Sequence, residues 1–286
     1  MTDIVVATGR GLLDATTGEA VGLEGSVDAL SPDGRWAVVA RRELWRNSDG
    51  WSQVAIADGW DLTSVMSQDE GAIVGTAEAH LLRVEGDRLE RVETFEIVDG
   101  RDEWFTPWGG PPDVRSMTQM NSHVFVNVHV GGIVRGDGSK WEPTMDIGND
   151  VHEVHSDGGT LFAACAVGLA QSDDAGASWI LADEHLHATY ARAITTDDEC
   201  VYMSVARGPG GGDAAIYRKP RDGGPFARCD LPSILDNIDT GCLDATGSLV
   251  AFGTRDGDVF ASRDRGATWE RSASGLPPVR ALRMDG

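Results

Sequence analysis

Short apolar runs alternate with polar clusters along the whole chain. The runs are rich in Val, Ile, Leu and Ala, and Gly, Asp and Pro cluster between them. Apolar residues rarely recur at every third or fourth position, which is the spacing that an amphipathic helix needs. Many short strands separated by turn residues are typical of antiparallel sheets. The pattern therefore predicts an all-β fold.

One eight-residue pattern occurs in full at two places. The segment GLAQSDDAGASWILAD begins at Gly168, and DVFASRDRGATWERSA begins at Asp258. Both contain Ser-x-Asp-x-Gly-x-Ser/Thr-Trp, at residues 172–179 in the first copy and 262–269 in the second. In this pattern the Asp and Ser side chains bond the backbone amides of a tight turn, and Gly accepts a positive φ. The Trp is expected to pack between neighbouring sheets.

Weaker copies of the pattern follow the same register. They lie around Asp49, Asp137 and Asp222, and strand–turn–strand segments without the pattern begin at His80 and Gly11. These segments divide the chain into seven units of about 41 residues each, which is the length of a four-stranded propeller blade.

The pattern resembles the Asp-box, or BNR, repeat of the sialidase-like propellers. That superfamily also includes the sortilin-type receptors, the two-propeller xyloglucanases and the photosystem II assembly factors. The resemblance implies a seven-bladed β-propeller with four-stranded antiparallel blades, forming a single domain over residues 1–286. It also implies that the Asp-box residues hold turns together and take no part in catalysis.

The two ends of the chain are expected to share one blade. The segment PVRALRMDG, from Pro278, has the pattern of a first, inner strand with no blade after it. The segment DIVVATGRGLLDATTGEAVGL, from Asp3, has the pattern of a blade that lacks its first strand. Pairing the two segments would close the propeller and remove its exposed sheet edges.

The two ends of each blade are expected to differ in role. Successive connections alternate between the ends, so the Asp-box turns lie at one end, here called the turn end. The opposite end, where the first strands begin, is called the loop end. The loop 98–112 lies at the loop end and carries Trp104, Phe105 and Trp108. Loops this long are usually functional, and we expect Trp104 and Trp108 to stack on the apolar part of a ligand.

The seven expected first strands share one pattern. They begin at Val27, Leu62, Val114, Val151, Ala191, Ile238 and Val279. Their first and fourth residues are mostly apolar, whereas the second residue is polar in every strand. These polar residues are Asp28, Thr63, Arg115, His152, Arg192, Asp239 and Arg280. If they point towards the propeller axis, they form one ring at the mouth of the central channel.

Three arginines in this predicted ring favour an anionic ligand. Arg115, Arg192 and Arg280 would repel one another unless a negative group lay between them, and guanidinium groups bind carboxylate or phosphate through paired hydrogen bonds. The alternative is that Asp28 and Asp239 neutralise the arginines internally, with water filling the channel.

Three histidines are expected near the same channel mouth. His129 should end a second strand, His152 lies in the predicted ring, and His187 precedes the first strand of the sixth blade. Together with Asp150 or Asp239, neutral imidazoles could bind a divalent metal ion. Because the chain has no local HxxxH spacing, ordinary hydrogen-bonded histidines are the alternative. No cofactor is expected, and a divalent metal stays open.

Two classes of function fit these residues. In the first, the channel mouth binds an anionic group of a small molecule, glycan or peptide and performs no chemistry. In the second, a hydrolase or lyase, similar to glycoside hydrolases and with or without a metal, uses the same mouth. His152 or His129 would then act as general base or metal ligand, and the arginines would stabilise developing negative charge. Tyr190 and Asp239 are further candidate catalytic residues.

Sialidase activity itself is not expected. A working sialidase needs an arginine triad, a Tyr/Glu nucleophile pair and an N-terminal Arg-Ile-Pro element, and this chain lacks the last of these. Tyr190 with Glu153, near the arginines, would imitate only part of such a site. Since a visible arginine ring stands against an incomplete set of catalytic groups, the sequence favours binding.

Charge and composition exclude other partners. The 286 residues include 46 acidic and 24 basic side chains, with a formal net charge of -22. Such a surface repels phosphate backbones and anionic lipid head groups, so nucleic acid and membrane are not expected as partners. No apolar run approaches the about 20 residues that span a bilayer, and the start of the chain has no signal-type segment. A cytoplasmic location is expected. The Gly-rich loop from Gly208 lacks the Lys-Ser/Thr of a phosphate-binding loop.

Overall fold

The computed structural model describes residues 3–69 and 71–284. In these ranges the regular structure is β-strand, apart from four short 3-10 helices. The strands form seven sheets, each with four strands. The protein is thus a seven-bladed all-β propeller, as the sequence pattern predicts. The chain divides into two compact units, and each is described by itself below.

The first unit comprises Met1–Val27, Ala164–Leu169 and Leu181–Gly286 and holds three of the sheets. One sheet has the order β28 (Val279–Met284), β1 (Ile4–Thr8), β2 (Gly11–Asp14) and β3 (Ala20–Glu24). The next consists of β20 (Tyr190–Thr196), β21 (Cys200–Ala206), β22 (Ala215–Pro220) and β23 (Ala227–Arg228). The third consists of β24 (Leu243–Thr246), β25 (Leu249–Gly253), β26 (Val259–Ser262) and β27 (Glu270–Ala273).

The second unit comprises Asp28–Ala163 and Ala170–Ile180. One of its sheets contains β4 (Val27–Leu30), β5 (Trp36–Val39), β6 (Glu43–Asn47) and β7 (Trp51–Ile56). Another contains β8 (Leu62–Gln68), β9 (Gly71–Thr76), β10 (Leu81–Glu85) and β11 (Arg88–Arg91). A third contains β12 (Val114–Met120), β13 (His123–Val128), β14 (Gly132–Gly136) and β15 (Trp141–Met145).

The remaining sheet has residues in both units. It contains β16 (Val151–Ser156), β17 (Leu161–Cys165), β18 (Gly168–Ser172) and β19 (Ile180–Ala182). The short helices all lie in the second unit, between strands. They are η1 (Ala77–Ala79), η2 (Glu93–Ile97), η3 (Arg101–Glu103) and η4 (Ile147–Asn149).

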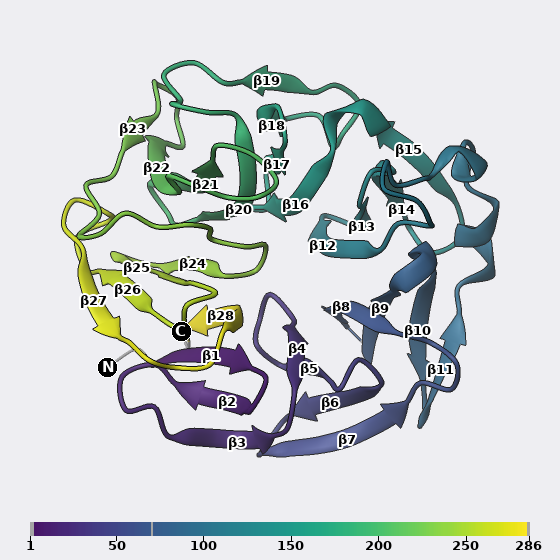
Figure 1. Ribbon diagram of the computed structural model, residues 1–286. Coiled ribbons are helices and arrows are strands. Elements are labelled where there is room, and N and C mark those ends of the chain that lie inside the picture. Colours follow the sequence, from purple (N-terminus) through teal and green to yellow (C-terminus); the bar gives the residue numbers. More distant parts are fainter. Residues whose placement is uncertain (1–2, 70, 285–286) are drawn as a thin grey trace. The chain divides into compact units, whose positions relative to one another are not determined.

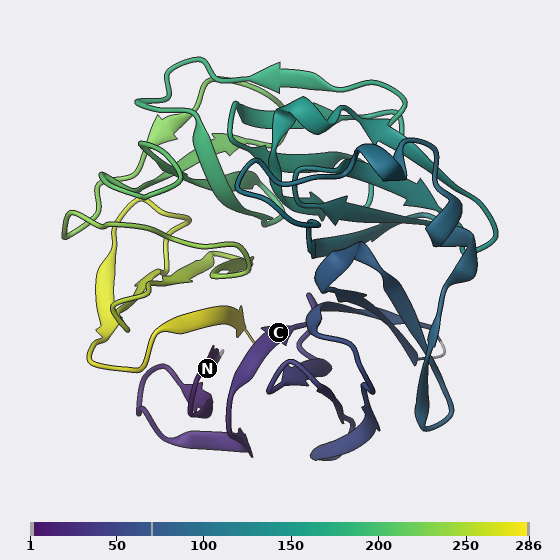
Figure 2. The same cartoon turned by 45° about the vertical axis from the view of Figure 1, so that its right-hand side comes forward.

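The chain ends share one sheet, as predicted. β28 pairs antiparallel with β1, with Ile4 opposite Met284 and Ala7 opposite Ala281. Figures 1 and 2 show the yellow β28 alongside the purple β1. The last two residues of the predicted strand, 285–286, lie outside the described residues. This pairing ties the two ends of the chain together, so β1 is an interior strand of its sheet and not an edge.

One of the seven predicted first strands is wrong. The segment at Ile238–Gly241 is not a strand, and the first strand of its sheet, β24, begins only at Leu243. A turn intervenes, in which the Cys242 amide donates to the Asp239 carbonyl at 3.1 Å and Gly241 has a positive φ of 72°. The pattern of one polar residue after an apolar one does not distinguish such a turn from a strand.

Even so, Ile238 occupies the place of a first-strand residue. Its carbonyl accepts a hydrogen bond from Ser204 Oγ in the preceding sheet at 3.1 Å. The Val114 carbonyl, at the start of β12, accepts the same bond from Ser64 Oγ at 3.0 Å. Asp239 therefore follows Ile238 as Arg115 follows Val114, although its backbone is irregular.

The two complete copies of the pattern form the same turn. In the first copy, Ser172 Oγ accepts from the Gly176 amide at 2.8 Å, and Asp174 Oδ1 accepts from the Ser178 amide at 2.8 Å. In the second copy, Ser262 Oγ accepts from the Gly266 amide at 2.7 Å, and Asp264 Oδ1 accepts from the Thr268 amide at 2.8 Å. The hydroxyl and amide of Ser178 lower the pKa of Asp174 to about 2, and those of Thr268 do the same for Asp264.

An arginine from the preceding sheet holds each of these turns. Arg135, in β14, donates from Nη1 to the Ala175 carbonyl at 2.8 Å. Arg218, in β22, donates from Nη1 to the carbonyl of Arg265, which is the residue at the same place in the second copy. Both carbonyl residues have a positive φ, 57° and 55°. The local pattern does not reveal these two arginines, because they lie 40 and 47 residues before the carbonyls to which they donate.

The core of each unit is apolar. In the second unit Phe95 packs edge-on against Trp141 with ring centroids 5.2 Å apart. In the first unit Phe252 packs against Phe260 and Trp269, with centroids 5.1 and 5.2 Å away. Trp269, the tryptophan of the second full copy of the pattern, is partly buried and packs against this core.

Candidate functional site

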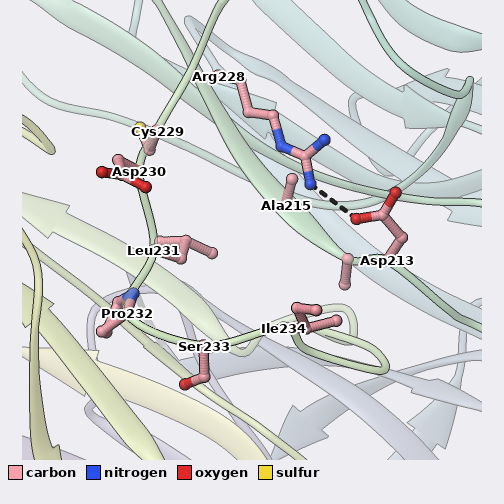
Figure 3. A pocket seen from close by; sticks show the side chains of 10 residues that line it. Asp213, Ala215, Arg228, Cys229, Asp230, Leu231, Pro232, Ser233 and Ile234 are labelled. Atoms are coloured by element: carbon pink, nitrogen blue, oxygen red, sulfur yellow. Dashed lines mark hydrogen bonds and ion pairs between the residues drawn. The ribbon is translucent and has the colours of Figure 1, made fainter.

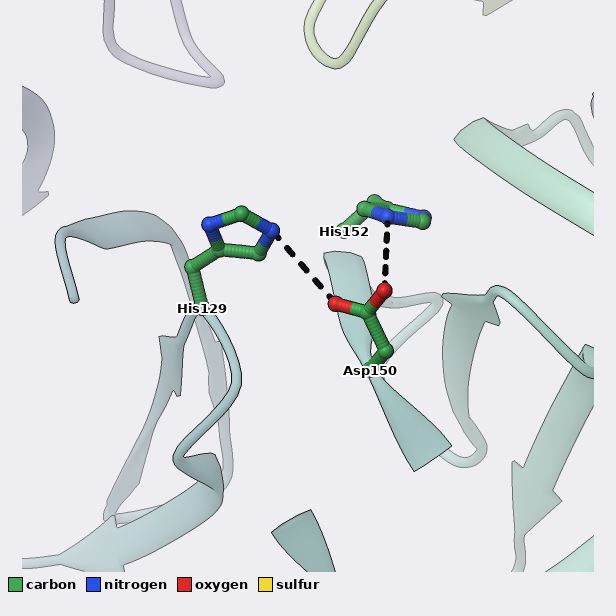
Figure 4. Close-up of side chains that lie close together, drawn as sticks. All are labelled: His129, Asp150 and His152. Carbon is green, nitrogen blue, oxygen red and sulfur yellow. Dashed lines mark ion pairs between the residues drawn. The ribbon is translucent and has the colours of Figure 1, made fainter. Parts of the chain in front are cut away.

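Three polar side chains of the second unit converge at the loop end. His129 directly follows β13, Asp150 directly precedes β16, and His152 is the second residue of β16. The His129 Nε2 atom lies 3.4 Å from Asp150 Oδ1, and the His152 Nε2 atom lies 3.7 Å from Asp150 Oδ2. Figure 4 shows both imidazole rings beside the carboxylate of Asp150. We call these three residues the His–Asp–His group.

A short helix places Asp150 in this group. At its start the Asp146 side chain accepts from the Gly148 amide at 2.8 Å, and η4 follows. The helix ends at Asp150, whose amide donates to the Ile147 carbonyl at 3.3 Å. Asp150 itself has φ 47° and ψ 72°, which is the left-handed region that residues other than Gly rarely adopt. The backbone therefore holds the Asp150 carboxylate in position at a cost in conformational energy.

The His–Asp–His group is largely buried. The side chain of His152 is completely inaccessible, and His129 is 8% exposed. Burial would raise the pKa of Asp150, but His129, His152 and Arg115 outweigh it and lower that pKa below its usual value. Asp150 Oδ1 is nevertheless buried without a hydrogen bond from any described residue. A buried carboxylate oxygen without such a bond is costly and calls for a functional explanation.

Arg115 belongs to the surroundings of this group. It is the second residue of β12, where the pairing with β13 shifts register between Val114 and Ser116. Its guanidinium is near enough to Asp150 to lower the pKa of that carboxyl. Of the seven predicted ring residues, Arg115 and His152 are thus brought close to the same carboxylate.

Trp108 is the exposed aromatic residue beside this group. Its side chain is 67% exposed, and its ring lies 5.3 Å from the ring of His129 at an angle of 39°. The Thr106 hydroxyl holds this loop by donating to the Gly109 carbonyl at 3.0 Å. Exposed aromatic faces beside polar groups are common in binding sites.

The prediction that Trp104 stacks on a ligand is wrong, because this side chain is buried. It is only 8% exposed and packs in the core of the second unit. Its ring lies 5.8 Å from Phe95 and 5.0 Å from the Arg101 guanidinium. Trp104 therefore anchors the loop, and Trp108 alone of the pair presents its ring to solvent.

In the first unit, Arg192 is neutralised by another ring residue. Arg192 Nη1 lies 2.6 Å from Asp239 Oδ1, and its Nη2 donates to the Pro209 carbonyl at 2.7 Å. Asp239 also pairs with Arg255 Nε at 2.5 Å. Arg192 is 9% exposed, and its guanidinium lies over the Tyr190 ring at 5.2 Å. Here the structure matches the alternative of internal neutralisation, so Arg192, Asp239 and Tyr190 act in packing and pairing.

The other predicted ring residues have local roles. Asp28 Oδ2 accepts from the Arg41 amide at 2.8 Å in the second unit. In the first unit, Arg280 is exposed and donates to Ser26 Oγ. A ring of all seven residues involves both units and stays a prediction.

His187 is an ordinary hydrogen-bonded histidine, which was the alternative to a metal ligand. Its Nδ1 lies 3.0 Å from the Tyr217 hydroxyl, and its Nε2 lies 2.9 Å from the Asp213 carbonyl. Both ring nitrogens therefore have protein partners, and His187 is not part of the His–Asp–His group. Asp213 ends the Gly-rich loop, which the Gly212 amide holds by donating to the Asp236 carbonyl at 2.6 Å.

A hollow of about 400 Å³ lies beside this loop in the first unit. Asp213 and Arg228 face each other in its wall, with Arg228 Nη2 2.8 Å from Asp213 Oδ1 (Figure 3). Arg207 adds a second ion pair to Asp213 at 2.9 Å. Asp213 and Arg228 are thus paired with each other in the wall of this hollow. The sequence analysis did not predict the hollow, since its lining residues share no motif.

No family model matches the chain, and no curated protein matches its sequence. Solved structures are similar in fold. The computationally designed Ika8 protein is 14% identical with a TM-score of 0.64, covering 99% of this chain and 88% of that one. YCF48 bound to D1 peptide is 15% identical with a TM-score of 0.60, covering 94% and 85%. The GH74 enzyme of Niastella koreensis is 13% identical with a TM-score of 0.58, covering 95% of this chain and 47% of that enzyme.

These likenesses support the fold alone, because all are below 25% identity. They include one propeller solved with a peptide and one glycoside hydrolase. A search of the described residues finds no helix with the length and apolar character to span a membrane.

Proposed function

We propose that this protein is a binding module for a peptide that carries a carboxylate, with its site at the loop end of the second unit. The observation that carries the proposal is the exposed ring of Trp108 beside His129, which in turn lies 3.4 Å from Asp150, the carboxylate whose pKa Arg115 helps to lower. An aromatic face and a guanidinium group on one surface suit a ligand with an apolar part and an anionic group.

Three arginines, Arg115, Arg192 and Arg280, are the candidates for binding the anionic group of the ligand. Arg192 is paired with Asp239, so it has no charge to offer unless that pair breaks. Breaking a mostly buried ion pair is costly. Arg280 lies in the first unit, where it donates to Ser26 Oγ, so we assign Arg115 of the second unit to the ligand carboxylate. The structure of YCF48 with D1 peptide shows a peptide on a protein of the same fold, which makes a peptide the preferred ligand class.

Fluorescence anisotropy with labelled acidic peptides tests the proposal. Peptides with a free carboxylate should bind at least tenfold more tightly than their amidated forms, and Trp108→Ala and Arg115→Gln should each weaken binding by about tenfold or more. Phe105→Ala is the matched control for Trp108, because Phe105 is an exposed aromatic residue of the same loop. Arg83→Gln, an exposed arginine paired with Glu85, is the control for Arg115. Equal losses in variants and controls would refute the site.

A second candidate is a hydrolase or lyase at the same site. The observation that favours it is the short distance between the imidazoles and the Asp150 carboxylate. Glycosidases usually need two carboxyl groups about 5–10 Å apart, whereas Asp150 is the one carboxylate in this group. The general base would therefore be His129 or His152. Turnover of chromogenic glycosides that disappears in His152→Ala would favour this candidate, and binding without turnover would favour the first.

We also infer that the chain is related to the Asp-box propellers. The two full copies of the pattern support this, because they make the same hydrogen bonds from Ser, Asp and Gly at the turn end. The stability of variants at Asp264, described below, tests the structural role that this relationship implies.

A further inference from the structure

We propose that His129, Asp150 and His152 bind a divalent transition-metal ion of the Zn²⁺ class. One nitrogen of each imidazole and one oxygen of the carboxylate lie within 4.8 Å of one another. All three come from the second unit, and each is positioned by a strand or by the turn before it. The inference does not depend on the proposed peptide site.

The distances fit atoms that share one metal ion. Zn²⁺ binds His nitrogen and carboxylate oxygen at about 2.0–2.2 Å, so two ligands at a tetrahedral angle lie about 3.3–3.6 Å apart. The His129 nitrogen is 3.4 Å from Asp150 Oδ1, and the His152 nitrogen is 3.7 Å from the other carboxylate oxygen, Oδ2. These separations are long for hydrogen bonds and close to those expected between metal ligands. The group thus needs only small side-chain movements to bind an ion.

Burial and backbone geometry indicate a prepared site. His152 is completely buried, and Asp150 Oδ1 has no hydrogen bond from the described residues. Asp150 has a positive φ of 47°, which aspartate adopts more readily than most residues. A metal ion would satisfy its buried oxygen.

The ligand atoms select the class of metal. Imidazole nitrogens suit Zn²⁺, Co²⁺, Ni²⁺ and Fe²⁺, whereas Ca²⁺ and Mg²⁺ prefer sites made only of oxygen. Two histidines and one carboxylate also leave coordination positions open for water or for an oxygen of a ligand. The group therefore resembles an open site rather than a closed structural one.

The net charge of the protein and the charge of Arg115 have opposite effects on a bound cation. The formal net charge of -22 attracts cations towards the protein. Arg115 acts against a cation, because its positive charge reaches Asp150. A metal at this place should therefore bind more tightly when Arg115 loses its charge.

Calorimetric titration of chelator-treated protein with ZnCl₂ and CoCl₂ tests the proposal. The wild type should bind one ion at a saturable site, and bound Co²⁺ should show the visible absorption of nitrogen coordination. Asp150→Asn and His152→Ala should each weaken Zn²⁺ binding by about 100-fold or more. His187→Ala, which removes a hydrogen-bonded histidine of the first unit, should change it little. Arg115→Gln should strengthen it by about threefold.

Several results would overturn the proposal. One is the absence of saturable Zn²⁺ binding by the wild type. Another is a Zn²⁺ affinity of Asp150→Asn that equals that of the wild type. A third is equal binding of Mg²⁺ and Zn²⁺, which would indicate adsorption to surface carboxylates. If His152→Ala does not fold, as judged by circular dichroism, His129→Gln replaces it, because His129 lies nearer the surface. Peptide binding measured in the presence of chelator reports on the proposed function separately.

Discussion

Arg115 and Arg192 occupy the same place in two blades, yet their surroundings differ. Arg192 pairs at 2.6 Å with Asp239, whose other oxygen pairs with Arg255 at 2.5 Å. Near Arg115, the carboxylate of Asp150 has two imidazoles at 3.4 and 3.7 Å and a buried oxygen without a hydrogen bond. In the first group both oxygens of Asp239 are paired, although Arg192 Nε is buried without a hydrogen bond from the described residues. In the second group a carboxylate oxygen itself has no hydrogen bond, so we propose that the same strand position serves structure in one unit and ligand binding in the other.

The difference arises from the segment before each first strand. Before β16, the helix η4 ends in a strained Asp150 that directs its carboxylate between His129 and His152. Before β24, the chain makes a turn after Asp239, and Asn237 Nδ2 also donates to that carboxylate at 2.8 Å. Local backbone geometry thus decides whether the carboxylate is satisfied within the protein.

Replacing Arg192 should have the largest effect on stability. Arg192→Ala leaves Asp239 with Arg255 alone and removes a mostly buried guanidinium, so the free energy of unfolding should fall by about 2 kcal/mol. Chemical denaturation measures this change. Zn²⁺ and peptide binding should persist in the folded variant. A loss of binding with no loss of stability would mean that Arg192 belongs to the site after all.

A substitution in the Asp-box turn at Asp264 should have the next largest effect on stability, and this effect should depend on pH. In Asp264→Asn the hydrogen bonds from Thr268 to a carboxylate are weakened, so the melting temperature should fall, by less than in Arg192→Ala. Since the pKa of Asp264 is lowered from 3.8 to about 2, its stabilising effect is complete above about pH 5 and is lost as the pH falls towards 2.

Melting temperatures of the wild type and of Asp264→Asn between pH 7 and pH 2 check this prediction. The two curves should converge at the acidic end. A constant difference over the whole range would contradict the role of the Asp264 carboxylate, and so would the absence of any difference at pH 7.

Arg115→Ala should change stability much less than Arg192→Ala. Arg115 is only partly buried, and the change in the free energy of unfolding should stay within about 0.5 kcal/mol. The same denaturation experiment measures both variants. If Arg115→Ala costs as much as Arg192→Ala, the two arginines have equivalent structural roles and the contrast between the two groups fails.

His129→Gln should have the smallest effect on stability. Its imidazole lies 3.4 Å from Asp150 Oδ1, and a Gln side chain can supply a polar contact in its place, so the stability of the metal-free protein should change little. In the presence of Zn²⁺, the wild type should gain thermal stability and the variant should not. A large loss of stability without metal would assign His129 to the fold rather than to the site.

Much of the fold could be predicted from the sequence because its signals are local. The residues of each repeated turn make the hydrogen bonds of that turn, so the turn can be recognised from its own sequence. The alternation of apolar and polar residues likewise indicates each first strand. The shared blade of the termini follows from counting strands. The exception, Ile238–Gly241, arose because a turn before β24 has the same residue pattern as a strand start.

The site could be predicted only in part, because it depends on contacts between distant segments. His129 and His152 were predicted from their strand positions, whereas the carboxylate was left open between Asp150 and Asp239. The burial of Trp104 against Phe95 and the pairing of Arg192 with Asp239 depend on tertiary packing, which no local pattern records. The same holds for Arg135 and Arg218, whose partners are backbone carbonyls.

The most direct test of the account is an X-ray crystal structure of protein soaked with Zn²⁺, measured with anomalous scattering at the zinc absorption edge. We predict one strong anomalous peak within about 2.0–2.2 Å of a nitrogen of His129, an oxygen of Asp150 and a nitrogen of His152. A crystal in which zinc occupies only surface carboxylates, with Asp150 still 3.4 Å from His129, would contradict the central claim.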